Sequence, residues 1–171
     1  MFIHCIILTL LATQPAPEKK SLVTRDRIQL NLSGAETVLE AAKAKATTMG
    51  LKVNVAVVDE GGHLLSFARM DGARPASGNT ALTKAIAAAT FRQETGPALV
   101  KGEPDLLLSL SLQATAVAGG GKGTALKGGV PILIDGQVVG AVGIGGGTGE
   151  QDVEVAKAGI QALLDGLKVK K

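Results

Sequence analysis

Apolar and polar positions follow a helical period and then a strand period in the first part of the chain. The helical period covers residues 33–49 and stops at Gly50, a residue type that commonly ends helices. Ser33, followed three residues later by Glu36, predicts a capping box at the start of this helix. Residues 53–58 are rich in β-branched side chains and predict a buried strand.

Two hairpins are predicted from paired apolar runs that flank glycine-containing turns. In the first hairpin, residues 59–62 supply the positive φ angles that the turn requires, and residues 63–70 return as the partner strand. In the second, residues 131–134 and 138–144 flank an Asp-Gly pair, which is a strong hairpin signal between apolar runs.

Helices and loops are predicted between and after the hairpins. A polar loop over residues 71–78 leads into a helix from about Asn79, with Phe91 closing its apolar face. Residues 94–104 have no regular pattern, and residues 105–117 predict a short leucine-rich helix.

The end of the chain completes the expected domain. A flexible glycine-rich loop is expected over residues 119–129, and a last helix over residues 150–166. Together the elements predict a single α+β domain, in which helices pack on an antiparallel sheet of four or five strands.

The composition narrows the classes of function. The chain has 171 residues, which suits one domain with a sizeable core. It has no Trp and no Tyr, so a surface that stacks single-stranded bases is poorly supported and no nucleic-acid partner is expected. The net charge is +3, but the basic residues cluster only in the tail over residues 168–171, which is expected to be solvated.

The N-terminal region predicts export. Residues 2–12 form an apolar run of signal-peptide length that is too short to span a bilayer. Cleavage at Ala16 would make residues 1–16 a signal peptide and residues 17–27 a flexible segment of a periplasmic or extracellular protein. No Lys or Arg precedes the run, so the signal is atypical and a cytoplasmic chain is the alternative. An exported chain would lose Cys5, its only cysteine, and with it any disulfide or thiolate site.

Two glycine-rich loops share some features with phosphate-binding motifs. Residues 119–124 lack the Gly-Lys-Ser/Thr order of a P-loop and follow a helix, so no nucleotide is expected. Residues 143–149 run from a strand into a helix, where free amides favour anions such as a carboxylate. The candidate anion donors there are Gly145, Gly146, Gly147 and Thr148. The alternative is a tight turn with Thr148 as the N-cap.

The loop after the first hairpin is a second candidate for anion binding. Arg69 and Arg74 offer paired donors to a carboxylate, and Asp71 can orient one of them. Ser77 and Lys84 follow at the start of the next helix. The alternative is an internal Arg–Asp bridge that fixes the loop, and the residues alone do not separate the two.

Candidate metal ligands are few. Glu60 and His63 flank the first hairpin turn and offer a weak, exposed metal site, with solvated turn residues as the alternative. No His/Cys cluster has the spacing of a zinc site, so no zinc is expected.

Four ordered blocks of sequence resemble the GlcG/HbpS family over residues 28–167. The first block is VVDEGGHLLSFARMDGA, which begins at Val57. The others are Thr83-Lys84-Ala85 with Phe91-Arg-Gln-Glu-Thr95, then Gly128-Gly129-Val-Pro131-Ile132, and the run from Val139 to Asp152. This resemblance implies a profilin-like fold and a homo-oligomer, either a hexamer or an octamer.

The resemblance also implies a ligand. An exported chain looks most like the haem-binding branch of the family, so haem or a related tetrapyrrole is expected. A membrane sensor is the partner that this branch implies, and any activity would be slow haem degradation with release of iron.

Thr95 and Glu60 carry over from the family by position, and three further contacts are expected from the chemistry of the side chains. Thr95 matches the position linked to the haem iron, and a threonine oxygen is a weak axial ligand, so exchangeable haem is expected. Phe91 is expected to give apolar contact, and Lys84 and Arg69 to pair with the propionates. Glu60 matches the acidic positions linked to iron.

Two other functions stay open. A small-molecule enzyme or binder that acts on a hydroxy or keto acid would hold the carboxylate at residues 145–148 or on Arg69 and Arg74, although no general base with an orienting partner is evident. An oligomeric partner protein of a membrane sensor, without a ligand of its own, is the third function.

Overall fold

Four strands form one antiparallel sheet in the computed structural model, which describes residue 24 and residues 27–168. The strand order is β2-β1-β6-β5. The first hairpin contains β1 (Asn54–Asp59) and β2 (Leu64–Arg69), and the second contains β5 (Gly129–Ile134) and β6 (Gln137–Gly145). β1 pairs with β6 at the centre of the sheet. The predicted α+β fold with a four-stranded antiparallel sheet is therefore confirmed.

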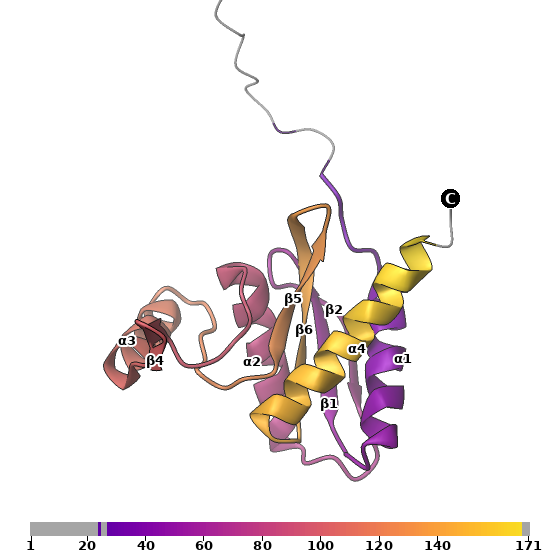
Figure 1. The fold of residues 1–171 in the computed structure, drawn as a ribbon, viewed down its shortest axis with the longest axis horizontal. Coiled ribbons are helices and arrows are strands. Elements are labelled where there is room, and N and C mark those ends of the chain that lie inside the picture. The colour runs from indigo at the N-terminus through magenta and orange to yellow at the C-terminus, as the bar shows by residue number, and fades with distance from the viewer. Residues whose placement is uncertain (1–23, 25–26, 169–171) are drawn as a thin grey trace, which may run out of the picture.

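The sheet lies between two unequal helical layers (Figure 1). α1 (Leu32–Thr48) and α4 (Gly149–Lys168) cover one face, and α2 (Ala76–Phe91) covers the other. Because side chains alternate along a strand, Val55 and Val57 enter the larger core beneath α1 and α4. Ala56 and Val58 enter a smaller core that is built mainly from alanines of α2.

α2 approaches the sheet closely because its partner strand β6 (Gln137–Gly145) has glycines at positions that face the helix. Gly143 and Gly145 of β6 face this helix, and a Cβ atom at Gly143 would collide with the carbonyl oxygen of Ala81. A Cβ atom at Gly145 would lie 2.5 Å from the carbonyl oxygen of Ser77. This close packing holds the first half of α2 over the end of β6, where Ser77 and Lys84 lie.

A lobe projects beyond α2, away from the sheet (Figure 1). It consists of a short hairpin, β3 (Leu99–Val100) with β4 (Glu103–Pro104), and the helix α3 (Leu106–Ala118). α3 contains no charged residue, and Ser109 is its only buried residue. Among the described helices, none is both long and apolar enough to cross a bilayer.

Several local predictions need correction. The N-cap of α1 is Asn31, whose Oδ1 accepts a hydrogen bond from the amide of Gly34 at 2.8 Å, so Ser33 lies inside the helix and the predicted capping box does not form. α2 begins at Ala76, three residues before Asn79, because the carbonyls of residues 74 and 75 already accept the first amides of the helix. Phe91 does not close an apolar core face, since it is 47% exposed.

The remaining helix and turn predictions hold, within a few residues at the ends. Asp135 and Gly136 both have positive φ, at 49° and 75°, as the second hairpin turn requires. Residues 99–104, predicted as irregular, form the small hairpin of the lobe. The predictions for residues 1–16 and for the end of the basic tail lie outside the described residues.

Candidate functional site

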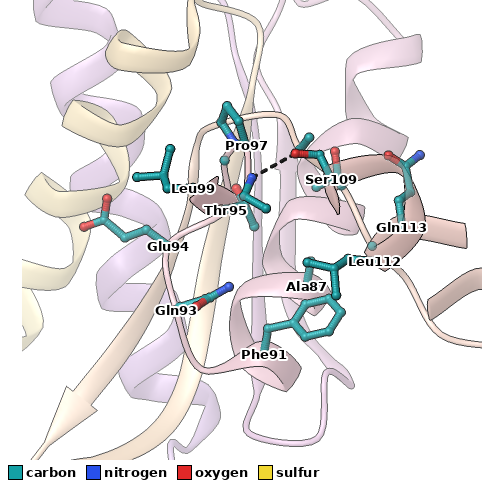
Figure 2. A pocket seen from close by; sticks show the side chains of 15 residues that line it. Ala87, Phe91, Gln93, Glu94, Thr95, Pro97, Leu99, Ser109, Leu112 and Gln113 are labelled. Carbon is teal, nitrogen blue, oxygen red and sulfur yellow. Dashed lines mark hydrogen bonds between the residues drawn. The ribbon is translucent and has the colours of Figure 1, made fainter. Parts of the chain in front are cut away.

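The predicted site residues divide between two cavities. The larger is a groove of about 620 Å³ between the end of α2, the segment that follows it and α3 (Figure 2); we call it the Phe91 groove. Its lining comprises Ala87, Phe91, Gln93, Glu94, Thr95, Gly96, Pro97, Ala98, Leu99, Ser109, Leu112, Gln113, Gly123, Thr124 and Ala125.

Apolar side chains from two helices meet at one end of the groove. Phe91 comes from the last turn of α2 and Leu112 from α3, and both are about half exposed. α2 stops just after Phe91 because Arg92 adopts a left-handed conformation with φ of 58°. The hydroxyl of Ser109 accepts from the amide of Ala98 at 2.9 Å, which ties the segment after α2 to α3.

Thr95 lies in the groove wall, where it pairs with the start of β5. Its amide donates to the carbonyl of Gly129 at 2.9 Å, and its Oγ1 accepts from the amide of Gly129 at 2.8 Å. Thr95 is 8% exposed, so most of this residue is covered by its neighbours in the groove wall. Gly129 leaves room for this pairing, because a Cβ atom there would lie 2.8 Å from Cγ2 of Thr95.

The polar lining of the Phe91 groove offers only amide, hydroxyl and carboxylate groups. Within the described part of the chain, no His, Cys, Met, Lys or Arg lines it. The carboxylate of Glu94 pairs with Lys157 at 2.8 Å, and the pair is about half exposed. A metal-containing ligand in this groove would therefore meet oxygen donors.

The second cavity lies at the end of β6 and has a volume of about 250 Å³; we call it the Arg74 cavity. Its lining comprises Arg74, Ser77, Thr80, Lys84, Leu126, Lys127, Gly145, Gly146, Gly147, Gly149 and Asp152. The segment over residues 123–127 contributes to both cavities and separates them. Thr95 and Lys84, which were expected to bind the same haem, therefore line different cavities.

Lys84 lines the Arg74 cavity rather than the Phe91 groove. Its ammonium lies 2.7 Å from Oδ2 of Asp152 and donates to the carbonyl of Ile144 at 2.8 Å. Lys84 and Asp152 are 3% and 2% exposed. A buried ammonium is tolerated only when it is paired, so this contact is a structural link between α2 and α4. The expected pairing of Lys84 with a propionate beside Thr95 does not match this geometry.

The glycine turn before α4 is a helix cap. Oγ1 of Thr148 accepts from the amide of Gln151 at 3.3 Å, and Oε1 of Gln151 accepts from the amide of Thr148 at 2.9 Å. Oδ1 of Asp152 accepts from the amide of Gly147 at 2.9 Å. The reciprocal bonds between Thr148 and Gln151 form a capping box. The amides of Gly147 and Thr148, two of the four predicted anion donors, therefore already have partners. The alternative that gave Thr148 as the N-cap is the one that the structure contains.

The arginine loop is not fixed by an internal bridge. In the described residues, neither Arg69 nor Arg74 forms an ion pair with Asp71, and Arg69 and Asp71 line neither cavity. The carbonyl of Arg74 accepts from Nδ2 of Asn54 at 3.1 Å, so the loop is held through its backbone. Arg74 lines the second cavity.

The first hairpin turn holds Glu60 and His63 apart from both cavities. Glu60 lies 3.7 Å from Arg27, and Nδ1 of His63 lies 3.1 Å from Oδ2 of Asp59. Partial burial raises the pKa of Asp59, but hydrogen bonds from His63 and Gly61 outweigh it and hold this pKa below its ordinary value. The described residues contain no group of three or more metal-ligating side chains, and iron at this turn stays a prediction.

Sequence reasoning missed several residues that shape the two cavities. The structural roles of Asp152, Lys127 and Gly129 were missed because their partners lie far away in the sequence. The capping box could have been found, since Thr148 and Gln151 have the required spacing.

Comparison with known proteins gives consistent matches. The sequence model of the family described as "Haem degrading protein HbpS-like" matches residues 30–161. Protein GlcG of Escherichia coli K12 is 37% identical over 120 residues, which cover 70% of this chain and 84% of GlcG.

Solved structures agree with the sequence matches. A double mutant of Streptomyces reticuli HbpS is 30% identical with a TM-score of 0.67, covering 89% of this chain and 98% of HbpS. A complex of PduOC with haem is 25% identical with a TM-score of 0.62, covering 79% of this chain and 95% of PduOC. The chain therefore belongs to the GlcG/HbpS family.

Proposed function

We propose that this protein binds haem or a related tetrapyrrole in the Phe91 groove. The observation that carries the proposal is that Thr95, which matches the family position linked to the haem iron, and Phe91, expected to give apolar contact, both line one groove of about 620 Å³. That volume lies in the range of roughly 300–1,000 Å³ that is typical of small-molecule sites. The existence of a haem complex for the related PduOC supports the choice of ligand.

The groove residues suit a planar apolar ligand that binds loosely. Phe91 and Leu112 are half exposed from two different helices and can pack against a ring system. The hydroxyl of Thr95 accepts one hydrogen bond from Gly129 and keeps a second lone pair for an iron atom. Oxygen donors are weak axial ligands compared with His or Cys, so the bound haem would exchange readily.

The residues that would meet the propionates differ from those first expected. No cation among the described residues lines the groove, and Lys84 and Arg69 lie elsewhere. The propionates would therefore point out of the open groove toward solvent, where their charge is hydrated. Affinity would come mainly from apolar contact, which makes Phe91 the most sensitive position.

A haemin titration of the chain, followed by absorbance, tests this proposal. We expect a saturable Soret shift, and Phe91→Ala should weaken binding about tenfold or more because a large apolar contact is lost. Phe67→Ala is the matched control, because Phe67 is also about half exposed but lies on β2, outside the groove. A titration that never saturates, or an equal loss in both variants, would remove the proposal.

Thr95 is tested by two substitutions of similar size. Thr95→Val removes the hydroxyl and should change the spectrum of the bound iron, whereas Thr95→Ser should keep it. Thr95→Val also leaves the amide of Gly129 unsatisfied, so its fold is checked by circular dichroism. Loss of Soret absorbance with a reductant and oxygen, together with captured iron, is the assay for haem degradation.

We also propose that the protein is a homo-oligomer that pairs through α3. A helix with five exposed leucines and no charge is unusual on a free surface and suits an interface between subunits. Acidic Glu103 and Asp105 precede the helix and Lys122 follows it. Antiparallel pairing of two copies of α3 would therefore place each acidic end beside the basic end of its partner.

Export and a membrane sensor as partner are further proposals, which rest on residues 1–16 and on the family resemblance. The sequence of the mature N-terminus, read from protein recovered outside the cytoplasm, tests export. A chain that keeps Met1 and stays with the cytoplasmic fraction would contradict it.

A further inference from the structure

We propose that the Arg74 cavity is a second binding site, for a small monocarboxylic acid that carries a hydroxyl or carbonyl oxygen beside its carboxylate. The cavity of about 250 Å³ is too small for a tetrapyrrole and is separated from the Phe91 groove by residues 123–127. This site is independent of haem binding, so each proposal can fail without the other.

The mouth of the cavity is basic. The exposed guanidinium of Arg74 forms no ion pair with any other described residue. Lys127 also lines the cavity and donates to Glu150 at 2.9 Å, which leaves its ammonium two further donors. A planar guanidinium fork beside an ammonium matches the two oxygens of a carboxylate.

The floor of the cavity is polar but close to neutral in charge. Lys84 uses two of its three ammonium donors, on Ile144 and Asp152, and both oxygens of Asp152 accept hydrogen bonds. Ser77 is 7% exposed, and its hydroxyl has no hydrogen-bond partner among the described residues. Ser77 lines the cavity, so its hydroxyl is available to bond a ligand there. Such a floor fits a neutral oxygen rather than a second anion.

The walls are held in place by a buried amide. Nδ2 of Asn54, which is fully buried, donates to the carbonyls of Arg74 at 3.1 Å and Gly145 at 3.4 Å. Its Oδ1 has no partner, the only such buried side-chain atom in the described part of the chain. An unpaired buried carbonyl lowers the stability of the fold. We therefore attribute the presence of Asn54 at this position to its two hydrogen bonds, which hold two walls of the cavity.

Charge and geometry together select a monoanion. Because Lys84 already neutralises Asp152, the floor offers no free cation to the second charge of a dianion such as hydrogen phosphate. The amides of Gly147 and Thr148 at the start of α4 are already bonded, so the side chains and not the helix end would hold the ligand. The ligand would place its carboxylate at Arg74 and Lys127 and its second oxygen at Ser77.

Calorimetric titration of the chain with lactate, propanoate and inorganic phosphate tests the assignment. We expect saturable binding of lactate, weaker binding of propanoate by about fivefold to tenfold because one hydrogen bond is lost, and no binding of phosphate. Arg74→Gln should weaken lactate binding about tenfold or more, and Ser77→Ala should remove the difference between lactate and propanoate. Arg69→Gln is the matched control, because Arg69 lines neither cavity.

Three results would overturn the proposal. They are the absence of saturable binding for both lactate and its keto analogue pyruvate, an equal loss in Arg74→Gln and Arg69→Gln, and phosphate binding as tight as lactate binding. Haemin affinity measured on Arg74→Gln, and lactate affinity measured on Phe91→Ala, should stay unchanged. Circular dichroism of each variant confirms that its fold is intact.

Discussion

Lys84 is the residue whose role the structure defines most sharply. An ammonium removed from water costs several kcal/mol unless it is paired and hydrogen-bonded, and both conditions are met by Asp152 and Ile144. Gly128 makes the arrangement possible, since a Cβ atom there would lie 2.9 Å from the ammonium and 2.5 Å from Cβ of Asp152. Lys84 therefore joins α2 to α4 at the floor of the Arg74 cavity.

Removal of the ammonium should destabilise the fold strongly. Lys84→Met keeps the length of the side chain but leaves the carboxylate of Asp152 buried without its counter-charge, which costs about 3–5 kcal/mol. The free energy of unfolding in urea measures this loss. The double variant Lys84→Met with Asp152→Leu should recover part of it, because no isolated charge then stays buried.

A small effect would contradict this account of Lys84. If Lys84→Met lost less than about 1 kcal/mol, the pair would be no stronger than an exposed ion pair. Sequence reasoning could not assign this role, since Lys84 and Asp152 are 68 positions apart and neither lies in a pairing motif. The sequence assigns Lys84 to a ligand because its internal partner cannot be read from the residues around it.

Caps and turns decide where helices and strands begin and end, and only some of them were predicted correctly. The second hairpin turn followed from the Asp-Gly pair, because that pair supplies the required positive φ angles. The start of α1 was misassigned since two candidate caps, Asn31 and Ser33, stand two residues apart and only the side chain of Asn31 reaches a free amide. Local sequence thus predicts that a helix begins, but tertiary context selects the residue that caps it.

The turn of the first hairpin should make the protein sensitive to acid. Oδ1 of Asp59 accepts from the amides of Gly61 and His63 at 2.9 and 2.8 Å. These bonds hold the pKa of Asp59 below its ordinary value despite some burial, so the folded state prefers the ionised carboxylate. Its stabilising contribution is present above the ordinary pKa and is lost as the pH falls through the lowered value.

Asp59→Asn tests this contribution, because asparagine keeps the acceptor oxygen but does not titrate in this range. The free energy of unfolding is measured between about pH 6 and pH 3, near and below the ordinary pKa of Asp. The unchanged chain should lose more stability on acidification than the variant. Parallel pH profiles would show that Asp59 contributes nothing to acid sensitivity.

At the scale of the molecule, the sheet was predictable and the site was not. Both hairpins and their flanking helices were correct, because apolar periodicity and turn residues act locally. The residues expected to bind one haem are separated, since the approach of α2 to Gly143 and Gly145 places Lys84 and Phe91 in different cavities. That approach depends on which face of β6 the glycines occupy, which only the register of the sheet decides.

The projecting lobe carries the surface through which we expect the protein to assemble. Leu106 and Leu107 of α3 are 73% and 77% exposed, and such a surface is stabilised when a second copy covers it. Leu107→Glu would place a charge in the apolar contact of the α3 pair and should reduce the particle mass at least by about half, since a pair contains two copies. Multi-angle light scattering coupled to size exclusion measures this mass.

Leu167→Glu is the matched control, because Leu167 is also exposed but lies at the end of α4, on the other side of the sheet. Its particle mass should equal that of the unchanged chain. A monomeric unchanged chain would remove the proposed assembly altogether, and an equal loss of mass in both variants would show that α3 is not the contact.

A pair formed through α3 is also consistent with either expected assembly, because a hexamer and an octamer both contain a whole number of such pairs. Since α3 forms one wall of the Phe91 groove, loss of the pair should also weaken haemin binding, which the same two variants can measure.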